Sequence, residues 1–114
     1  MIIENSGLTG IQSELGHLDD VTTAVGFVRW QWEYYRATYD CKFEDASNQS
    51  EYFLRINVRA VEGKLEDPYA VLVIEDVYIG KATFPHGLDY ESAIPDAVMN
   101  AAKQKLSQLK QKLA

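Results

Sequence analysis

The sequence is poor in cysteine, histidine and proline, and it has no long hydrophobic run. Its 114 residues include one cysteine, two histidines and three prolines. A single cysteine excludes an internal disulfide framework and a cysteine-rich zinc site, and it favours a reducing compartment. The longest unbroken apolar run, Tyr69 to Ile74, is too short to span a bilayer. The first residues have neither a basic stretch nor an apolar run, so we expect no signal peptide and predict a cytoplasmic protein.

Basic residues are also scarce. The chain has 11 Lys and Arg against 17 Asp and Glu, a net charge of −6. Such a chain repels nucleic-acid phosphates unless it carries a local basic patch. Residues 1–94 have a balance of −9 and residues 95–114 a balance of +3. The lysines of this tail fall in the last turns of an expected helix, where cations are favoured. We therefore expect neither nucleic-acid nor membrane partners.

What is present is an ordinary globular composition with clear periodicity. Apolar residues make up 46% and charged residues 25% of the chain, which is typical of one folded domain spanning residues 1–114. Steps of three and four residues predict a long C-terminal helix. Its apolar face consists of Ile94, Val98, Ala102, Leu106, Leu109 and Leu113. A shorter helix is predicted at about residues 17–25, with Gly26 as its left-handed cap.

Alternating apolar and polar residues predict an antiparallel meander in the middle of the chain. The alternation runs through residues 35–43 and 52–60, on either side of a polar turn at 45–50. Pairing Cys41 with Leu54 places all inward side chains of this hairpin opposite one another, as a buried face requires.

A third strand extends the meander. Keeping the same face buried places Ala60 opposite Ala70. On the outer face, Asp40 and Glu75 should then lie on either side of Arg55 as an acid–base–acid ladder.

Upstream, a strand beginning near Val28 has its apolar residues at even positions, whereas the next strand has them at odd positions. The phase changes between Tyr34 and Tyr35, which predicts a bulge, a bend or a strand break there. Residues 8–15 are expected to form a first strand. The predicted fold is α+β in the order β-α-β-β-β-β-α, an antiparallel meander sheet of four to five strands with the long C-terminal helix packed on one face.

Motifs that would carry catalysis or bind a metal are missing. We find no Ser/His/Asp signature, no glycine-rich phosphate loop and no H-E-x-x-H, so we assign no catalytic residue, metal ligand or cofactor. The turn at residues 84–91 holds His86 between Pro85 and Gly87, with Asp89 close by. Loops on rigid scaffolds often carry function. This turn can be structural, can bind a ligand, or can supply a catalytic pair.

Aromatic residues gather where the strand phase changes. They are Trp30, Trp32, Tyr34, Tyr35 and Tyr39. Aromatic side chains at strand spacing are typical of a core. A phase change among bulky rings is also where a cavity or an aromatic surface for a partner can form.

The chain resembles the YugN-like family, small proteins of Bacillus-type bacteria. The resemblance covers most of the length and rests on the order and spacing of several stretches. These are Glu4-Asn5-Ser6-Gly7-Leu8, Gly26-Phe27, Trp32-Glu33-Tyr34, Tyr39-Asp40, Tyr52-Phe53-Leu54-Arg55-Ile56, Ala60-Val61-Glu62-Gly63 and Pro85-His86-Gly87-Leu88-Asp89-Tyr90. None of them is a catalytic signature. The resemblance implies no established activity.

Three functional hypotheses follow. The first is a non-enzymatic binding or protein-interaction module, with a homodimer as one form. Its interface would be the outward sheet face, which carries Phe53, Arg55, Arg59, Val71 and Val73. The alternative is a helix-grip-like carrier of a small apolar ligand, bound near His86, Asp89, Trp30, Trp32 and Tyr34. The third is an enzyme that uses His86 and Asp89.

Overall fold

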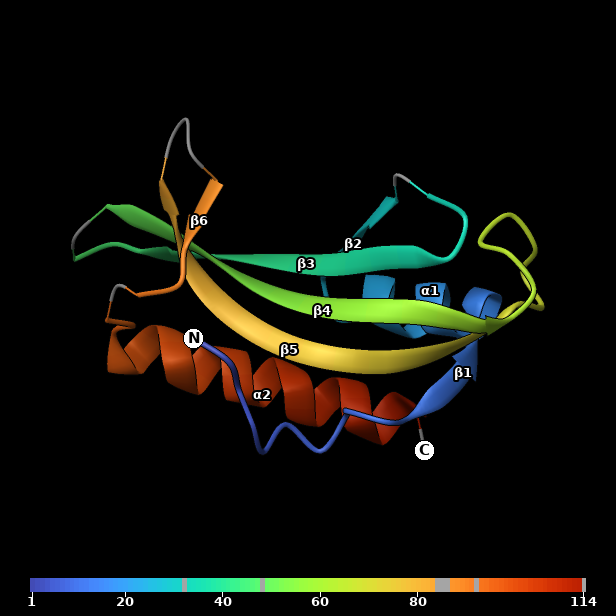
Figure 1. The fold of residues 1–114 in the computed structure, drawn as a ribbon. Coiled ribbons are helices and arrows are strands. Elements are labelled where there is room, and N and C mark those ends of the chain that lie inside the picture. Colours follow the sequence, from blue (N-terminus) through green and yellow to red (C-terminus); the bar gives the residue numbers. More distant parts are fainter. Residues whose placement is uncertain (32, 48, 84–86, 92, 114) are drawn as a thin grey trace.

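The computed structural model describes residues 1–31, 33–47, 49–83, 87–91 and 93–113 of the chain. Its elements are β1 (Gln12–Glu14), α1 (Leu15–Ala24), β2 (Val28–Gln31), β3 (Arg36–Asp45), β4 (Ser50–Glu62), β5 (Val71–Thr83), β6 (Gly87–Asp89) and α2 (Asp96–Leu113). The predicted α+β class is confirmed, with a C-terminal helix beside an antiparallel sheet (Figure 1). The described sheet has six strands instead of the expected four to five, because part of the turn after β5 pairs with it as β6.

The strands follow the order β1-β5-β4-β3-β2, and β6 also pairs with β5. The edge of β5 that faces away from β4 is therefore covered at both ends, by β1 and by β6. Between them the N-terminal segment bonds to the same edge, where the Ile3 amide donates to the Val77 carbonyl at 2.8 Å. Covering an edge in this way removes a template for aggregation.

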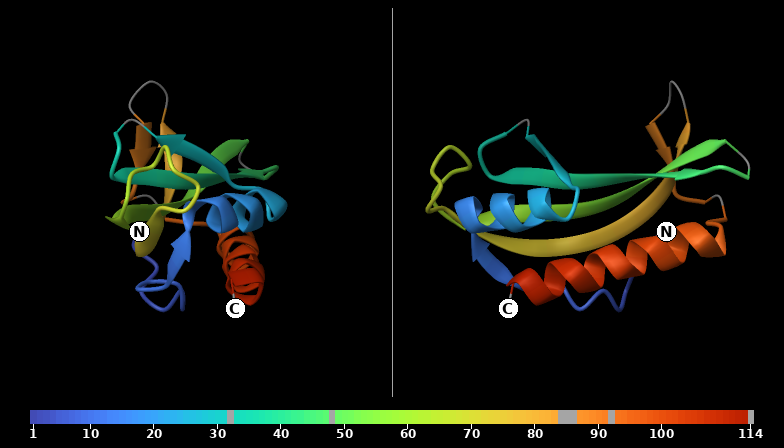
Figure 2. Two further views of the ribbon diagram at one scale, coloured as in Figure 1. Left: turned by 90° about the vertical axis from the view of Figure 1, so that its right-hand side faces the viewer. Right: turned by 180° about the vertical axis from the view of Figure 1, so that it is seen from behind.

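Both described helices lie on one side of the sheet. Figure 2 shows α1 and α2 side by side beneath the strands. We call the side that faces the helices the inner face and the opposite side the outer face. A Schellman motif ends α1 as predicted, because Gly26 has φ +98° and the Phe27 amide donates to the Thr22 carbonyl at 2.9 Å.

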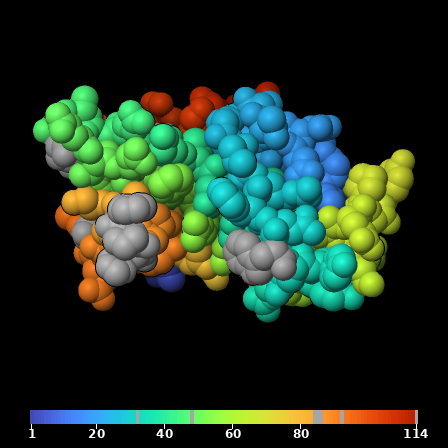
Figure 3. Space-filling model, turned by 90° about the horizontal axis from the view of Figure 1, so that it is seen from above, coloured from blue at the N-terminus to red at the C-terminus, as the bar shows by residue number. Residues whose placement is uncertain are grey.

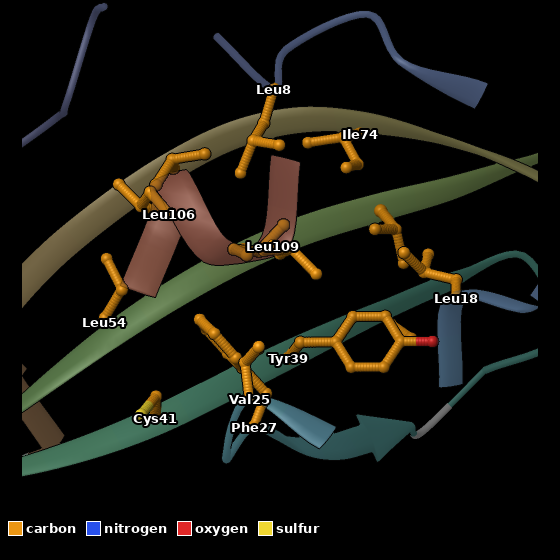
Figure 4. Close-up of a cluster of buried hydrophobic side chains, with 14 of the residues drawn as sticks. Leu8, Leu18, Val25, Phe27, Tyr39, Cys41, Leu54, Ile74, Leu106 and Leu109 are labelled. Atoms are coloured by element: carbon orange, nitrogen blue, oxygen red, sulfur yellow. The ribbon is translucent and has the colours of Figure 1, made fainter. Parts of the chain in front are cut away.

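The hydrophobic core fills the space between the inner face and the two helices. Figure 4 shows leucines of both helices pointing toward strand side chains. Leu18 of α1 and Leu109 of α2 are at most 1% exposed, as are Leu54 and Ile56 of β4. The sequence predicted that Leu106 and Leu109 are buried, and both are.

The first predicted hairpin is correct. In the structure Cys41 lies opposite Leu54, and Phe43 lies opposite Tyr52. The break near Tyr34 is confirmed as well, since β2 ends at Gln31 and β3 begins at Arg36.

The predicted register of the second hairpin is wrong. Ala60 lies opposite Leu72, not opposite Ala70. Irregularities interrupt this pairing: on β5 both Glu75 and Asp76 fall opposite the single residue Asn57. A bulge of this kind shifts the phase of a strand, which an unbroken alternation cannot accommodate. The two adjacent acids in an otherwise apolar strand are the sequence signal that indicates this bulge.

The register change splits the predicted ladder. Asp40 does bind Arg55, at 2.9 Å, but Glu75 lies 3.3 Å from Arg59 instead. On β5, the residue directly opposite Arg55 is Tyr78. The bulge thus brings an aromatic hydroxyl, in place of a second carboxylate, to the middle of the outer face.

The core interpretation of the aromatic cluster holds for Tyr39 alone among its described members. Tyr39 is 1% exposed, whereas Trp30, Tyr34 and Tyr35 are 60%, 56% and 51% exposed. These three lie at or beyond the short edge strand β2, where no described layer covers them. Trp32 lies outside the described residues.

Tyr39 couples the core to a surface ion pair. Its hydroxyl donates to Oδ1 of Asp19 at 2.7 Å, and Arg29 Nη1 lies 3.3 Å from Oδ2 of the same carboxylate. Burial raises the pKa of Tyr39 far above its ordinary value, and the neighbouring Asp19 raises it further.

This arrangement predicts alkaline instability. Above about pH 10 the unfolded chain releases the tyrosine proton that the folded chain keeps, so the free energy of unfolding should fall by up to about 1.4 kcal/mol per pH unit from this group. Urea unfolding at a series of alkaline pH values measures the slope. Tyr39→Phe should flatten it, whereas Tyr35→Phe, a change at an exposed ring, should not. Equal slopes in the wild type and Tyr39→Phe would contradict the assignment.

Candidate functional site

The centre of the outer face carries a cluster of polar side chains. Strand alternation directs Thr38 and Asp40 of β3 outward, together with Arg55 and Asn57 of β4. The bulge adds Tyr78 of β5. Since no described helix covers this side, these residues form the floor of an open depression.

Two adjoining hollows occupy this place, with volumes of about 550 and 410 Å³. Thr38 and Arg55 line both of them. We call the joined hollows the outer-face groove, with a floor of Thr38, Asp40, Arg55, Asn57 and Tyr78 and with walls that include Trp30, Phe53, Leu88 and Tyr90. Seen from above, the groove lies between the orange β6 region and the teal β2–β3 region (Figure 3).

Aromatic rings border the groove at both ends. Trp30 lies on β2 directly opposite Thr38, and it is 60% exposed. At the other end, the rings of Tyr78 and Tyr90 meet with centroids 5.6 Å apart at an angle of 58°. Gly80 makes this contact possible, because a Cβ there would lie 3.0 Å from Cδ1 of Tyr90.

An ion pair crosses the floor. Nε and Nη2 of Arg55 donate to Oδ1 and Oδ2 of Asp40, each at 2.9 Å. The Asp40 side chain is 7% exposed and that of Arg55 is 31% exposed. The hydrogen bonds to Asp40 raise the pKa of the Arg55 guanidinium. The two charges therefore cancel within the floor, and the remaining Nη1 lies 3.5 Å from the Tyr90 hydroxyl.

Two floor atoms are buried but unsatisfied. Thr38 Oγ1 and Asn57 Oδ1 have no hydrogen-bond partner among the residues that the structure describes. They belong to residues directly opposite each other on β3 and β4, and Thr38 is only 6% exposed. We call them the open polar atoms. A buried polar atom without a partner costs about 1–3 kcal/mol, which a hydrogen-bonding ligand can offset.

Tyr78 adds a donor beside these atoms. The Asn57 side-chain amide donates to its hydroxyl oxygen, which leaves the phenolic hydrogen free to point elsewhere. Burial is the main cause that raises the pKa of Tyr78, and the charge of Asp76 adds to it. The phenol therefore stays protonated at neutral pH.

The structure brings some predicted residues together and separates others. Trp30, a predicted ligand residue, shares the groove with Phe53 and Arg55, which were predicted as interface residues. Tyr34 lies elsewhere, with Lys64 Nζ 5.5 Å from its ring centroid. His86 and Trp32 lie outside the described residues.

Asp89 also lies outside the groove lining. It is half-buried in β6 opposite Lys81, and its Oδ1 accepts a hydrogen bond from the Glu91 amide at 2.9 Å.

The other predicted interface residues lie further along the outer face. Val71, Val73 and Arg59 are half-buried there. Arg36 lies directly opposite Arg59. Each of these cations has an acid of the same chain nearby: Glu33 lies 3.7 Å from Arg36, and Glu75 lies 3.3 Å from Arg59.

Sequence reasoning missed Thr38, Asn57, Tyr78 and Tyr90 as site residues. Alternation alone placed the first two on the outer face, but nothing local marked their polar atoms as unsatisfied. The inclusion of Tyr78 depends on the bulge in β5. Tyr90 was seen only as part of a turn, whereas in the structure its ring lies against that strand.

A larger hollow, of about 650 Å³, lies between the N-terminal segment and α2. Its cations, Lys103 and Lys110, are exposed, and among the described residues it contains no buried unsatisfied polar atom. The described residues also hold no group of three or more His, Cys, Asp or Glu side chains suited to a metal ion. Nor do they form a helix with the length and apolar character needed to cross a membrane.

Together, the fold and the groove define a small α+β protein whose antiparallel sheet is covered by helices on one face and hollowed on the other. The chain belongs to the YugN-like family, whose model matches residues 4–113. It is 37% identical over 101 residues to the uncharacterised protein YlbA of Bacillus subtilis (strain 168). The match covers 88% of this chain and 82% of YlbA.

A solved structure extends the likeness to the whole fold. The crystal structure of the uncharacterised conserved protein YugN from Geobacillus kaustophilus HTA426 matches with a TM-score of 0.85 and 34% identity. The match covers 99% of this chain and 94% of that one. The family resemblance predicted from the sequence is confirmed. These relatives are described as uncharacterised, so the function has to be argued from the groove.

Proposed function

We propose that this chain is a non-enzymatic cytoplasmic binding protein that holds a small molecule in the outer-face groove. The observation that carries the proposal is the Thr38 hydroxyl, which is buried at the junction of the two hollows with no hydrogen-bond partner among the described residues. Each hollow falls within the range of about 300–1,000 Å³ that is typical of ligand pockets. A hydrogen-bonding ligand seated on Thr38 would offset the cost of burying that group.

A small molecule fits the outer face better than a second copy of the chain. Arg36 and Arg59, whose mutual repulsion an acid of a partner could relieve, already have Glu33 and Glu75 beside them. The face is also hollowed at its centre, whereas an isologous interface needs matching surfaces. The cytoplasmic assignment draws support from the single, buried, free cysteine.

Binding without catalysis follows from the occupied ion pair. A hydroxyl such as that of Thr38 needs a nearby base to act as a nucleophile. Asp40 is the carboxylate of the groove floor, and both of its oxygens already accept hydrogen bonds from Arg55. These described residues therefore supply hydrogen bonds and aromatic contact rather than a proton acceptor.

Filling the groove tests the proposal. Ala82 lines the groove from β5, opposite Leu88 of β6. Ala82→Phe should occupy the space and abolish binding. The wild type, incubated with the low-molecular-mass fraction of a bacterial extract, should carry a ligand adduct in native mass spectrometry. The variant should carry none. An adduct that survives Ala82→Phe, or a wild type that acquires no adduct, would overturn the proposal.

Val73→Glu is the matched control. Val73 also lies on the outer face but outside the groove lining, so this variant should keep the adduct. The same variant tests the homodimer that the sequence suggested, because a buried glutamate would shift a sheet-face dimer toward monomer. Sedimentation of the wild type and of this variant measures that shift.

A further inference from the structure

Resting on the proposed function, we infer that the groove takes an uncharged, flat ligand with a hydrogen-bond donor and acceptor on one edge, as in a primary amide or a lactam ring. Three features lead to this class. They are the neutralised floor, the open polar atoms, and the aromatic walls at both ends.

The neutral floor disfavours charged ligands. An anion bound to the remaining Nη1 of Arg55 would share this cation with Asp40, whose carboxylate is only 7% exposed, and would give the floor an excess negative charge. A cation would have to compete with Arg55 for oxygens that already accept two hydrogen bonds at 2.9 Å. Burying a charge that has no partner of its own is costly, so an uncharged ligand avoids a penalty that either ion incurs.

The open polar atoms favour a ligand edge that carries both a hydrogen-bond donor and a hydrogen-bond acceptor. The side-chain oxygen of Asn57 accepts, while the Thr38 hydroxyl can accept or donate. The Tyr78 hydroxyl, held from one side by the Asn57 amide, can donate. An amide presents N–H and C=O groups side by side and can satisfy such a set. A wholly apolar ligand would leave these atoms unpaired and buried.

The walls favour a flat shape. Trp30 lies directly across the β2–β3 pairing from Thr38, so its indole borders the place where the polar edge would bind. Tyr90 stands at the opposite end against Gly80. Aromatic side chains prefer stacked or edge-to-face contact with other rings. A ring that carries the amide can therefore contact an aromatic wall while its edge reaches the floor.

Four probes of matched size test the inference: benzamide, benzoate, benzylammonium and toluene. Titration of the intact ¹⁵N-labelled protein, followed by NMR shifts, measures each dissociation constant. Benzamide should bind at least about tenfold more tightly than the other three, and its shifts should centre on Thr38, Asn57 and Tyr78. Thr38→Val, which removes the hydroxyl and keeps the shape, should weaken benzamide about tenfold and leave toluene unchanged.

Each other outcome has a defined meaning. Tighter binding of benzoate or benzylammonium in the groove would overturn the uncharged class but keep the binding function. Equal binding of toluene and benzamide would overturn the hydrogen-bonding edge. If no probe shifts the groove resonances while native mass spectrometry still finds an Ala82→Phe-sensitive adduct, the ligand class is wrong and the proposed function stands. If native mass spectrometry also finds no such adduct, both the ligand class and the proposed function are wrong.

Discussion

Replacing Leu109 by alanine should lower the free energy of unfolding by about 2–5 kcal/mol, the range measured for leucine truncation in well-packed cores. Leu109 is 0% exposed and points from α2 toward the sheet (Figure 4). It is a better test than Leu106, which borders the hollow beside the N-terminal segment and so has a softer environment. The cost arises because the surrounding strands cannot close over the space that the side chain leaves.

Urea unfolding of the wild type and the variant measures this loss. Gln108→Ala is the control, since Gln108 neighbours Leu109 on the same helix but is exposed. The control should change stability by less than about 0.5 kcal/mol, as surface substitutions usually do. A loss that small for Leu109→Ala would show that α2 does not hold the inner face together.

The second large effect is expected at the ion pair in the groove. Arg55→Leu leaves the Asp40 carboxylate buried without its cation. Breaking a fully buried pair costs about 3–5 kcal/mol. Because the Arg55 side chain is 31% exposed, water can partly replace it. We therefore expect the free energy of unfolding to fall by about 2 kcal/mol, which is less than the cost of breaking a fully buried pair.

A double variant separates the unpaired charge from the lost packing. Asp40→Leu combined with Arg55→Leu removes both charges, so it should be more stable than Arg55→Leu alone. Chemical unfolding of the wild type, the single variant and the double variant provides the comparison. If the double variant is instead less stable than Arg55→Leu, the unpaired Asp40 carboxylate is not the cause of the stability loss in Arg55→Leu.

Local patterns predicted those parts of the fold in which each residue depends on near neighbours. The three-and-four spacing on α2, the cap at Gly26 and the hairpin that pairs Cys41 with Leu54 all came from periods of a few residues, and the structure agrees with each. The same reasoning placed Asp40 beside Arg55, because a correct hairpin register determines both faces at once.

The second hairpin shows where such reasoning ends. An ideal alternation cannot reveal that β5 takes up an extra residue at Glu75 and Asp76 opposite Asn57. That bulge decides that Tyr78, and not a carboxylate, lies across from Arg55. The aromatic cluster stayed open between core and surface for a related reason: spacing says which side of a strand a ring occupies, but not whether another layer covers that side. Core and ligand site therefore both stayed open for Trp30, which is exposed and lines the groove.

By itself the sequence determined the α+β class, the two helices and the register of the first hairpin, because these follow from short-range periodicity and local capping. Only the tertiary structure decided which atoms of the outer face remain unsatisfied and which rings enclose them. Thr38 Oγ1 is an open polar atom because of what β2 and β4 place around it. Tyr90 becomes a wall because Gly80, ten residues earlier, leaves room for its ring. The groove depends on contacts between residues of different strands, and no local pattern encodes them.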